Sequence, residues 1–495
     1  DSAKELVQLN QEENDTLLSI QAPIVLCTSR ASAKIASNIA PGNDRLGIML
    51  PYTPLHPLLL SEKLDTLVMT SANFSEEPIC IDNDEALERL SDLADYFLLH
   101  NRDIYLRSDD SVVMEMSNTI RPIRRSRGYA PRPIFLKKSG PSILAVGGEL
   151  KNVVALSKGE KVFLSQHIGD LENLEAYEFF QMTIDHIQRI FEIEPELIVH
   201  DLHPEYLSTK WAKDQSLPLF GVQHHHAHLA SCMAENNLDE PVIGIIMDGT
   251  GYGTDGTIWG GEFLVGDASG FERMAHFEPM PLPGGEAAIK SPWRIGLSYL
   301  YQVFGDNLPA IPALENHDIQ PIVQMLEARI NSPLTSSCGR LFDAVAALSG
   351  GRQEIRYEAQ AAIEFMQAAQ NQLGNDLSLF KPLSIDKKHI IPIKPIMESL
   401  VSRIQAGKTI RQLSQWFHHS LIQTFVDISV QLRAETGINK IVLSGGVFQN
   451  QLLFEGLLRD LDTRKFSTIT HQQVPTNDGG IALGQVALGQ NFLRK

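Results

Sequence analysis

VIGIIMDGTGYGTDGTIWGGEFLVGD, residues 242–267, is the stretch that decides the fold class. An apolar run ends at Asp248, and a glycine-rich turn and a second apolar run follow, which is typical of a β-hairpin. A related pattern, ILAVGGELKNVVALSKGEKVFLSQHIGD, occupies residues 143–170 and contains three apolar runs separated by Gly-Glu and Lys-Gly-Glu. The helical segment after it carries Leu174, Tyr177, Phe180 and Ile184 at helical spacing. Two successive meander-plus-helix units predict a duplicated α/β fold with two lobes and a cleft between them.

Apolar runs bounded by turn signals alternate with amphipathic segments along the rest of the chain as well. They include APIVLCTS, DTLVMTSAN, LIVHD and NKIVLSGG, and this alternation is the rhythm of an α/β protein. The densest break is residues 121–143, RPIRRSRGYAPRPIFLKKSGPSI, where Pro, Gly and basic residues cluster. We expect a linker there, preceded by a smaller domain of short strands that contains the loop TSANFSEEP.

Length, charge and cysteine content limit the classes of protein to consider. A chain of 495 residues should hold roughly two to four domains. Its net charge of -18 argues against non-specific binding to nucleic acid or an anionic membrane, and no apolar run approaches the ~20 residues of a spanning helix. The four cysteines form no C-x-x-C pair, which favours a reducing cytoplasm. The first residues lack both a Met and a signal-peptide pattern, so we expect an internal cut in a longer protein.

Four histidines in the stretch QHHHAHLASCMAEN, residues 223–236, form the most unusual cluster of the sequence. If this stretch is helical, His224 and His228 share one face at i, i+4, about 6 Å apart and close enough to bind one metal ion. The pair His225 and His228, at i, i+3, is also within reach. A helix start that merely tolerates histidines would give the same pattern, so further ligands have to decide.

Two aspartates follow apolar runs at points where a chain commonly turns into a site. Asp248 opens the glycine-rich hairpin, and Asp478 lies in TNDGGIALGQ just before an expected helix. Two His and one or two Asp suit a divalent transition ion such as Fe or Zn with coordination left open. Taken singly, each Asp-Gly is also an ordinary turn signal, and no H-E-x-x-H motif supports a metalloprotease.

Ser444-Gly445-Gly446, within IVLSGGVFQNQLL, joins an expected buried strand to a helix. Glycines at such a turn let backbone N–H groups point at a phosphate, although a plain strand-to-helix turn reads the same way. No Walker A lysine follows. In SSCGRLFDAVAAL, Asp343 is expected on a helix, where its carboxylate holds ribose hydroxyls or is simply solvated.

Several motifs fall in an order that resembles the HypF carbamoyltransferase family of nickel–iron hydrogenase maturation. They are QHHHAH, DGTGYGTDGTIWGGE, PLPGG with SPWR, SSCGRLFDAVAAL, YEAQAAIE, LSGGVFQN and NDGGIALGQ. The first part of the chain is similar to the YrdC-like domain of that family, through APGNDRLGIMLPYTPLHPLLL, LVMTSANFSEEP, HNRDIYLRSDDSVV and RRSRGYAP. The resemblance covers essentially the whole chain.

This resemblance implies two catalytic parts. Residues 1–135 would be a YrdC-like domain, with its start missing, that makes carbamoyl adenylate from carbamoyl phosphate and ATP with Mg. Residues 141–495 would be a two-lobed, TsaD-like transfer domain of the actin/hexokinase-like (ASKHA) ATPase type. This second domain would pass the carbamoyl group to the C-terminal cysteine thiol of the partner HypE, for synthesis of the cyanide ligand.

The resemblance also assigns residues by the family pattern. The metal ligands, for one Fe or Zn ion, would be His224, His228, Asp248 and Asp478, and the first three would also be catalytic. Nucleotide binding would involve, in the two domains, Ser71, Asn73, Asp343, Gly445, Gly446 and Asn450. For Ser71 and Asn73, an ordinary turn is the competing interpretation.

The sequence departs from the family pattern at two places. Full-length members begin with an acylphosphatase-like domain and zinc fingers, and a K-x-R element precedes S-x-N; we expect all of these upstream of the given sequence. In YEAQAAIE, Ala359 stands where relatives usually have Gly.

Other functions remain open on the residues alone. An O-carbamoyltransferase or a tRNA threonylcarbamoyl-transfer enzyme shares the fold, but domain order disfavours the first and acidity the second. A sugar-kinase-like or chaperone-like ATPase would bind only Mg with nucleotide. A scaffold without catalysis is the third alternative. We expect no nucleic acid or membrane partner.

Overall fold

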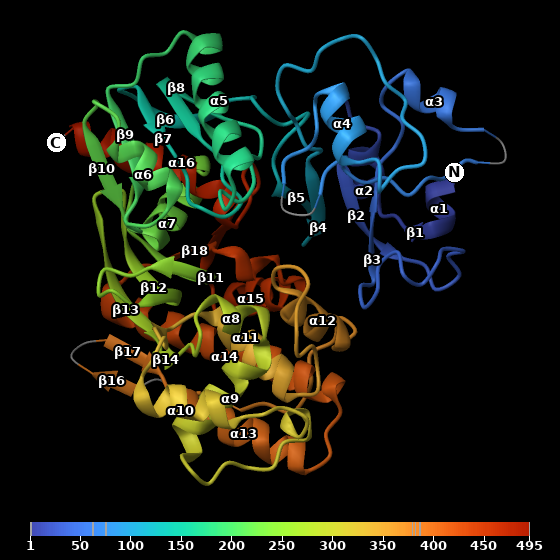
Figure 1. Ribbon diagram of the computed structural model, residues 1–495. Coiled ribbons are helices and arrows are strands. Elements are labelled where there is room, and N and C mark those ends of the chain that lie inside the picture. Colours follow the sequence, from blue (N-terminus) through green and yellow to red (C-terminus); the bar gives the residue numbers. More distant parts are fainter. Residues whose placement is uncertain are drawn as a thin grey trace. The chain divides into compact units, whose positions relative to one another are not determined.

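The computed structural model describes residues 2–61, 64–74, 77–378, 380–381, 383–385 and 388–494. The chain forms two compact units (Figure 1). Unit 1 consists of Asp1–Val222 and His471–Lys495, and unit 2 consists of Gln223–Thr470. In the described residues, unit 1 contains two β-sheets and unit 2 contains one. Among the described helices, none combines the length and the apolar character needed to cross a bilayer.

The first sheet of unit 1 is small and built from the early part of the chain. Its strand order is β1-β2-β4-β5, with β3 paired to β2, and only β2 and β4 run parallel. Its strands are β1 (Val7–Gln8), β2 (Ile24–Ser29), β3 (Arg45–Ile48), β4 (Val112–Met116) and β5 (Thr119–Arg124). The helices of this part are α1 (Ser2–Leu6), α2 (Gln11–Leu17), α3 (Leu55–Leu59) and α4 (Asn83–Arg89). Its core contains Val7, Leu17, Val25, Cys27, Leu46 and Val113.

The apolar run in DTLVMTSAN does not form the strand that the sequence predicts. Residues 65–73 contain no strand, and Val68 and Met69 are 76% and 58% exposed. An apolar run becomes a buried strand only where neighbours supply a hydrogen-bonding ladder and a covering layer. The described residues supply neither at this point. Positions 75 and 76 of the predicted loop TSANFSEEP lie outside the described residues.

The second sheet of unit 1 has the order β10-β9-β7-β8-β6. Strands β7 and β8 are antiparallel, as are β8 and β6, whereas β7, β9 and β10 are parallel. Its elements are β6 (Ile134–Gly140), β7 (Ile143–Ala145), β8 (Ala155–Leu164), α5 (Leu174–Phe191), β9 (Leu197–Asp201), α6 (Leu207–Lys213), β10 (Leu219–Val222) and α16 (Ile481–Arg494). The side chain of Gln485 on α16 accepts from the backbone N–H of Gly147 and donates to its carbonyl, which ties this helix to the end of β7.

Two local expectations for this sheet are wrong. No break occurs at Lys158-Gly159-Glu160, because these residues lie inside the continuous strand β8. The third strand of the meander is instead β6, which pairs with β8. The linker expected over residues 121–143 therefore contains the end of β5 and all of β6. The helix predicted after the meander forms as α5, in which Phe180 and Ile184 are buried and Leu174, its first residue, is 65% exposed.

Unit 2 is organised around a larger sheet of order β16-β17-β13-β12-β11-β18-β19. Its main strands are β11 (Val242–Tyr252), β12 (Ile258–Asp267), β13 (Gly270–Phe277), β16 (Leu383–Ile385), β17 (Lys388–Ile391), β18 (Lys440–Ser444) and β19 (Ser467–Thr470); β14 (Met280–Pro281) and β15 (Leu334–Thr335) join its side. The quoted stretch 242–267 is the antiparallel pair β11 and β12, as predicted.

The two larger sheets repeat one topology, which confirms the predicted duplicated fold. In each, a central strand, β7 or β11, has antiparallel neighbours on one side. On the other side lie two parallel strands, β9 and β10 or β18 and β19. The outer antiparallel strand is β6 in unit 1 and β13 in unit 2. Along the chain, β6 precedes the central strand of its sheet, whereas β13 follows it.

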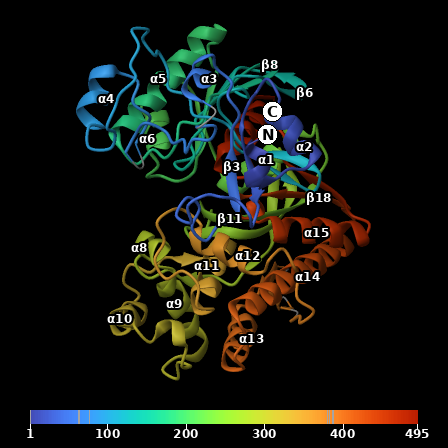
Figure 2. The same ribbon diagram turned by 90° about the vertical axis from the view of Figure 1, so that its right-hand side faces the viewer.

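The helices of unit 2 cover its sheet and build a helical layer beside it. They are α7 (His224–Glu235), α8 (Glu286–Lys290), α9 (Pro292–Phe304), α10 (Gln320–Ala328), α11 (Cys338–Leu348), α12 (Gln360–Ala368), α13 (Ile393–Gln405), α14 (Ile410–Thr436) and α15 (Gln451–Thr463). Figure 2 shows the long α14 beside α15. Helix α14 begins with a capping box from Thr409 and Gln412 and ends at Gly437 in the left-handed conformation. Ala359, at φ 58° before α12, occupies a conformation that favours glycine.

Replacing Phe263 by Ala should lower the free energy of unfolding of unit 2 by about 3–5 kcal/mol. Phe263 on β12 is fully buried, and its ring centroid lies 5.6 Å from that of Phe425 on α14. Denaturant titration with hydrogen exchange at β11 and β12 amides measures the change. As a control, Leu334→Ala at an exposed position should change this free energy by less than about 0.5 kcal/mol. Equal effects of the two substitutions would contradict this account of the core.

Candidate functional site

The helix that carries the histidines begins where the sequence predicts it. Gln223 is the N-cap of α7, and its side-chain oxygen accepts from the backbone N–H of His226. Its amide nitrogen donates to the carbonyl of Tyr252 and contacts Nδ1 of His225. This cap fixes the start of the helix, so that His224 and His228 lie one turn apart on the same face.

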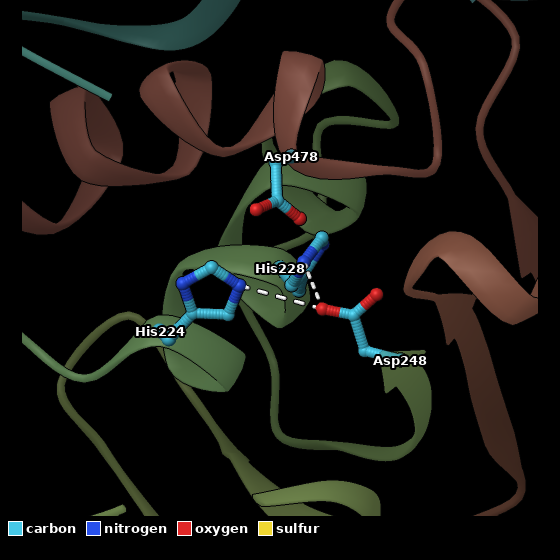
Figure 3. Close-up of side chains that lie close together, drawn as sticks. All are labelled: His224, His228, Asp248 and Asp478. Atoms are coloured by element: carbon cyan, nitrogen blue, oxygen red, sulfur yellow. Dashed lines mark ion pairs between the residues drawn. The ribbon is translucent and has the colours of Figure 1, made fainter. Parts of the chain in front are cut away.

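Asp248 lies where the pairing of β11 with β12 is interrupted before it resumes at Gly251. The pairing register of these strands shifts between Met247 and Gly251, and such irregularities re-aim a side chain. The Oδ2 atom of Asp248 lies 3.4 Å from Nε2 of His224 and 3.4 Å from Nε2 of His228 (Figure 3). All three side chains are buried.

These distances fit a shared metal ion better than a direct ion pair. A charge-assisted hydrogen bond between imidazole and carboxylate would be about 2.7–2.9 Å long. Two ligand atoms that each lie about 2.1 Å from a zinc-like ion at the tetrahedral angle are instead about 3.4 Å apart. Two imidazole nitrogens and one carboxylate oxygen are also the donor set that Fe and Zn accept. His224, His228 and Asp248 therefore fit a transition-metal site.

Electrostatics keep the Asp248 carboxyl ionised and the neighbouring His225 imidazole neutral. Burial opposes ionisation of Asp248, but the imidazoles of His224 and His228 outweigh it and hold the pKa of this carboxyl well below its usual range. Burial, reinforced by His224, lowers the pKa of His225 well below its usual range, so His225 is neutral at pH 7. His226 points elsewhere, with Nε2 2.8 Å from the carbonyl of Asp267. His224 and His228 are therefore the candidate ligands, and His225 and His226 are supporting residues.

The last residue of β18 and the loop that follows it contact two of these three side chains. Strands β11 and β18 are parallel, with Ile246 opposite Ser444, so Asp248 comes level with Gly446. The backbone N–H of Gly446 donates to Oδ1 of Asp248 at 2.9 Å, and Oγ of Ser444 lies 3.3 Å from Nδ1 of His228. A partner on Nδ1 and on the second carboxylate oxygen is what orients metal ligands in proteins.

Gly445 is required for the close approach of this loop to β11. Its φ is +102°, and a Cβ at this position would collide with the backbone carbonyl of Met247. The predicted strand-to-helix turn thus forms, with a short 3-10 turn (Gly446–Gln449) before α15.

Of the other predicted nucleotide residues of unit 2, one lies in the middle of α11 and one at the start of α15. Asp343 on α11 is buried, and burial raises its pKa to about 6 despite the nearby Arg340. Asn450 caps α15 with its Oδ1, which accepts from the N–H of Leu453, and its Nδ2 lies 2.9 Å from Nε2 of His418. The Asn450 side chain therefore orients the helix that follows the glycine loop.

The remaining predicted residues belong to unit 1. Ser71 is exposed, and Asn73 donates from Nδ2 to the carbonyls of Phe74 and Glu77, which closes the turn around it. Asp478, the fourth side chain drawn in Figure 3, is buried and opens the 3-10 turn (Asp478–Gly480) that leads into α16.

Sequence reasoning did not assign roles to the residues that hold these groups in place. Ser337 caps α11, and its Oγ lies 2.8 Å from the carbonyl oxygens of both Asp248 and Gly249. The position of Ser337 just before an expected helix is typical of an N-cap residue. Its contacts with Asp248 and Gly249 could not be predicted, because these partners are distant along the chain. The same holds for the contact of Gln223 with Tyr252 and of Ser444 with His228, since each partner lies on another element.

Replacing Gly445 by Ala should weaken metal binding by about 10- to 100-fold, because the displaced loop loses its contacts with Asp248 and His228. Gly437→Ala is a matched control. Gly437 also has a positive φ of +74°, but a Cβ there meets no atom within 4 Å, so this variant should lose about 1 kcal/mol of stability and keep its metal. Metal titration and thermal unfolding measure both effects. Equal metal affinity in the two variants would contradict the role of the loop.

The double variant His224→Ala/His228→Ala should purify without its transition ion, because carboxylates without the two imidazoles hold Fe or Zn weakly. Elemental analysis of the purified protein measures the ion. The control is His226→Gln, which removes a buried imidazole from the same helix but not from the predicted site. An unchanged metal content in the double variant would show that the ion binds elsewhere.

Comparison with known proteins identifies the family. Residues 244–485 match the family model "Carbamoyltransferase, Kae1-like Domain, second subdomain", residues 138–235 match "HypF Kae1-like domain", and residues 1–126 match the Sua5/YciO/YrdC model "Telomere recombination". The carbamoyltransferase HypF of Synechocystis sp. is 40% identical over 97% of this chain and 64% of its own length. The chain thus spans somewhat less than two thirds of that relative.

Two solved structures are similar over nearly the whole chain. Full-length HypF in a phosphate- and nucleotide-bound form is 44% identical, with a TM-score of 0.94, over 100% of this chain and 78% of that one. HypF of T. kodakarensis is 35% identical, with a TM-score of 0.92, over 99% of this chain and 66% of that one. Sequence and fold agree along the length compared, and the chain belongs to the HypF carbamoyltransferase family.

Proposed function

We propose that this chain carries out ATP-dependent carbamoyl transfer in the maturation of nickel–iron hydrogenase. The observation that carries the proposal is the convergence of two imidazoles and a carboxylate beside a glycine loop in unit 2. Such a site places a candidate Lewis acid beside a glycine turn at the start of a helix, a combination that suits acyl-phosphate chemistry. Family membership supports the same reaction class.

His224, His228 and Asp248 would hold the metal ion, with Asp478 as the fourth ligand. Asp478 suits this role because it is a buried carboxylate at the start of a helical turn. When bound, an Fe or Zn ion supplies a positive charge that polarises a carbonyl and orients a phosphate. The chain's own contribution is orientation, because the contacts of Gly446 and Ser444 hold the Asp248 carboxylate and the His228 ring in fixed directions.

The nucleotide would lie along Gly445, Gly446, Asn450 and Asp343 in unit 2. A relative crystallised in a phosphate- and nucleotide-bound form supports nucleotide binding in this family. The residues 1–135 domain would form carbamoyl adenylate from carbamoyl phosphate and ATP with Mg, using Ser71 and Asn73 at the phosphates. We assign the transfer domain to residues 141–495.

The transfer step would attach the carbamoyl group to the C-terminal cysteine thiol of HypE. The thiolate sulfur attacks the carbamoyl carbon, the bond between that carbon and the adenylate oxygen breaks, and AMP leaves with the electron pair. The thiol proton goes to solvent. Since a carbamate–phosphate anhydride hydrolyses readily, the burial of the site residues serves to keep water away from it.

Radiolabelled carbamoyl phosphate, ATP and HypE should yield a labelled C-terminal HypE cysteine when mixed with the full-length protein that contains this chain. Supplying preformed carbamoyl adenylate tests unit 2 without the first step. Asp248→Asn should reduce transfer from the adenylate by at least about 100-fold, because it weakens both the metal site and the Gly446 contact.

Asp267→Asn is the matched control, since Asp267 is the last residue of β12, its side chain accepts from Ser269, and its carbonyl oxygen lies 2.8 Å from Nε2 of His226. It should transfer at the unsubstituted rate. Label on tRNA or an aminoglycoside in place of HypE would contradict the proposed acceptor. Equal transfer by the two variants would contradict the proposed site.

A further inference from the structure

Arg340 is a buried cation beside the turn that carries Asp248. Its side chain is 7% exposed, and its Nη2 lies 3.7 Å from the position of a Cβ on Gly249. The start of α11 is fixed against this turn, because Ser337 contacts the carbonyls of Asp248 and Gly249 and also accepts from the N–H of Arg340. The guanidinium therefore has a defined place next to the candidate metal ligand.

The hydrogen-bonding capacity of Arg340 is only partly used. Its Nη2 lies 3.0 Å from Oδ2 of Asp343, a single contact and not the two parallel bonds of a bidentate pair. Among the described residues, Nε of Arg340 and Oδ1 of Asp343 have no hydrogen-bond partner, although both atoms are buried. A buried charged group with unmet donors is costly unless a ligand meets them.

A second buried arginine in the same unit shows what a purely structural role looks like. Arg273 donates from Nε to Glu262 at 2.6 Å, from Nη1 to Asp255 and from Nη2 to Ser336. Its guanidinium also lies 4.0 Å from the ring centroid of Trp259. Every nitrogen of Arg273 has a partner, in contrast to Arg340.

The position of Arg340 indicates the charge of the missing partner. The Oδ1 atom of Asp248 accepts from the backbone N–H of Gly446. The guanidinium of Arg340 lies next to Gly249, the residue that follows Asp248 in the chain. The N–H of Gly446 is already used by Asp248, whereas the planar guanidinium of Arg340 has a buried donor, Nε, without a partner among the described residues, and such a donor suits a phosphate oxygen. Oδ1 of Asp343 can still accept a hydroxyl, so this geometry is compatible with a ribose beside the phosphate.

We propose that Arg340 binds a phosphate oxygen of the nucleotide or acyl adenylate in unit 2, with Asp343 holding the guanidinium in place until the ligand arrives. This inference rests on the proposed nucleotide site and adds the residue that recognises its negative charge. The ligand class is a nucleoside phosphate, and a nucleoside without phosphate gains nothing from Arg340.

The test compares affinities for ADP and adenosine, because their ratio isolates the phosphates and cancels any contact with the ribose or base. All proteins compared carry Ser71→Ala and Asn73→Ala, which removes the other predicted nucleotide site. In Arg340→Met the preference for ADP over adenosine should fall about 10- to 100-fold, since a hydrogen bond to a charged group is lost. Arg340→Lys should keep part of the preference, because it keeps the charge but not the planar fork. Calorimetric titration measures each affinity.

Arg352→Met is the matched control, because Arg352 pairs with Glu364 at a partly exposed position farther along the chain. It should keep the full preference for ADP. An unchanged preference in a folded Arg340→Met protein would overturn the proposal.

A second pair of variants guards against misfolding of Arg340→Met, which leaves Asp343 without its counter-ion. The double variant Arg340→Met/Asp343→Asn removes both charges together, a change that folded proteins tolerate better than the loss of one partner. Compared with Asp343→Asn alone, it should show the same 10- to 100-fold loss of preference, and equal preferences would overturn the proposal. If the protein with native Arg340 does not prefer ADP to adenosine, the proposed nucleotide site fails together with this inference. If that preference is present but survives the loss of Arg340, only the role of Arg340 fails.

Discussion

The carboxylate of Asp248 is the group on which the rest of the candidate site depends. Its Oδ2 faces the Nε2 atoms of His224 and His228, and its Oδ1 accepts from the loop N–H of Gly446. Its backbone carbonyl is held by Ser337 at the start of α11. One residue within a central strand, where pairing with β12 is interrupted, thus connects two helices and a glycine loop, and any shift of β11 would move all of these contacts together.

The topology explains why these groups meet at this point. In unit 2 the strands β11 and β18 run parallel, so their carboxyl ends lie at the same edge of the sheet, where open α/β sheets bind ligands. Helix α7 packs on this sheet through Leu229, Cys232 and Met233. The apolar face of the helix is therefore fixed by the core, and its other face directs His224 and His228 toward Asp248.

Much of this arrangement follows from local sequence patterns. The hairpin at 242–267, the histidine helix and the turn at Gly445 were all predictable, because alternating apolar runs, helical spacing and glycine each have a local cause. Spacing alone did not choose between the 224/228 and 225/228 pairs, and the choice of His224 and His228 came from the family resemblance. The roles of Ser337, Ser444 and Arg340 could not be read from the sequence, since each depends on a partner that is distant along the chain. The strand expected at 65–73 failed for the same reason, because a strand needs neighbours that its own residues do not specify.

The central claim is that His224, His228 and Asp248 bind one transition-metal ion through Nε2, Nε2 and a carboxylate oxygen. X-ray absorption spectroscopy at the metal edge of the purified protein tests this claim directly. We predict a first shell of nitrogen and oxygen atoms at about 2.0–2.2 Å with the outer-shell scattering of two imidazole rings. A first shell of water oxygens without imidazole scattering, or one containing sulfur, would contradict the account.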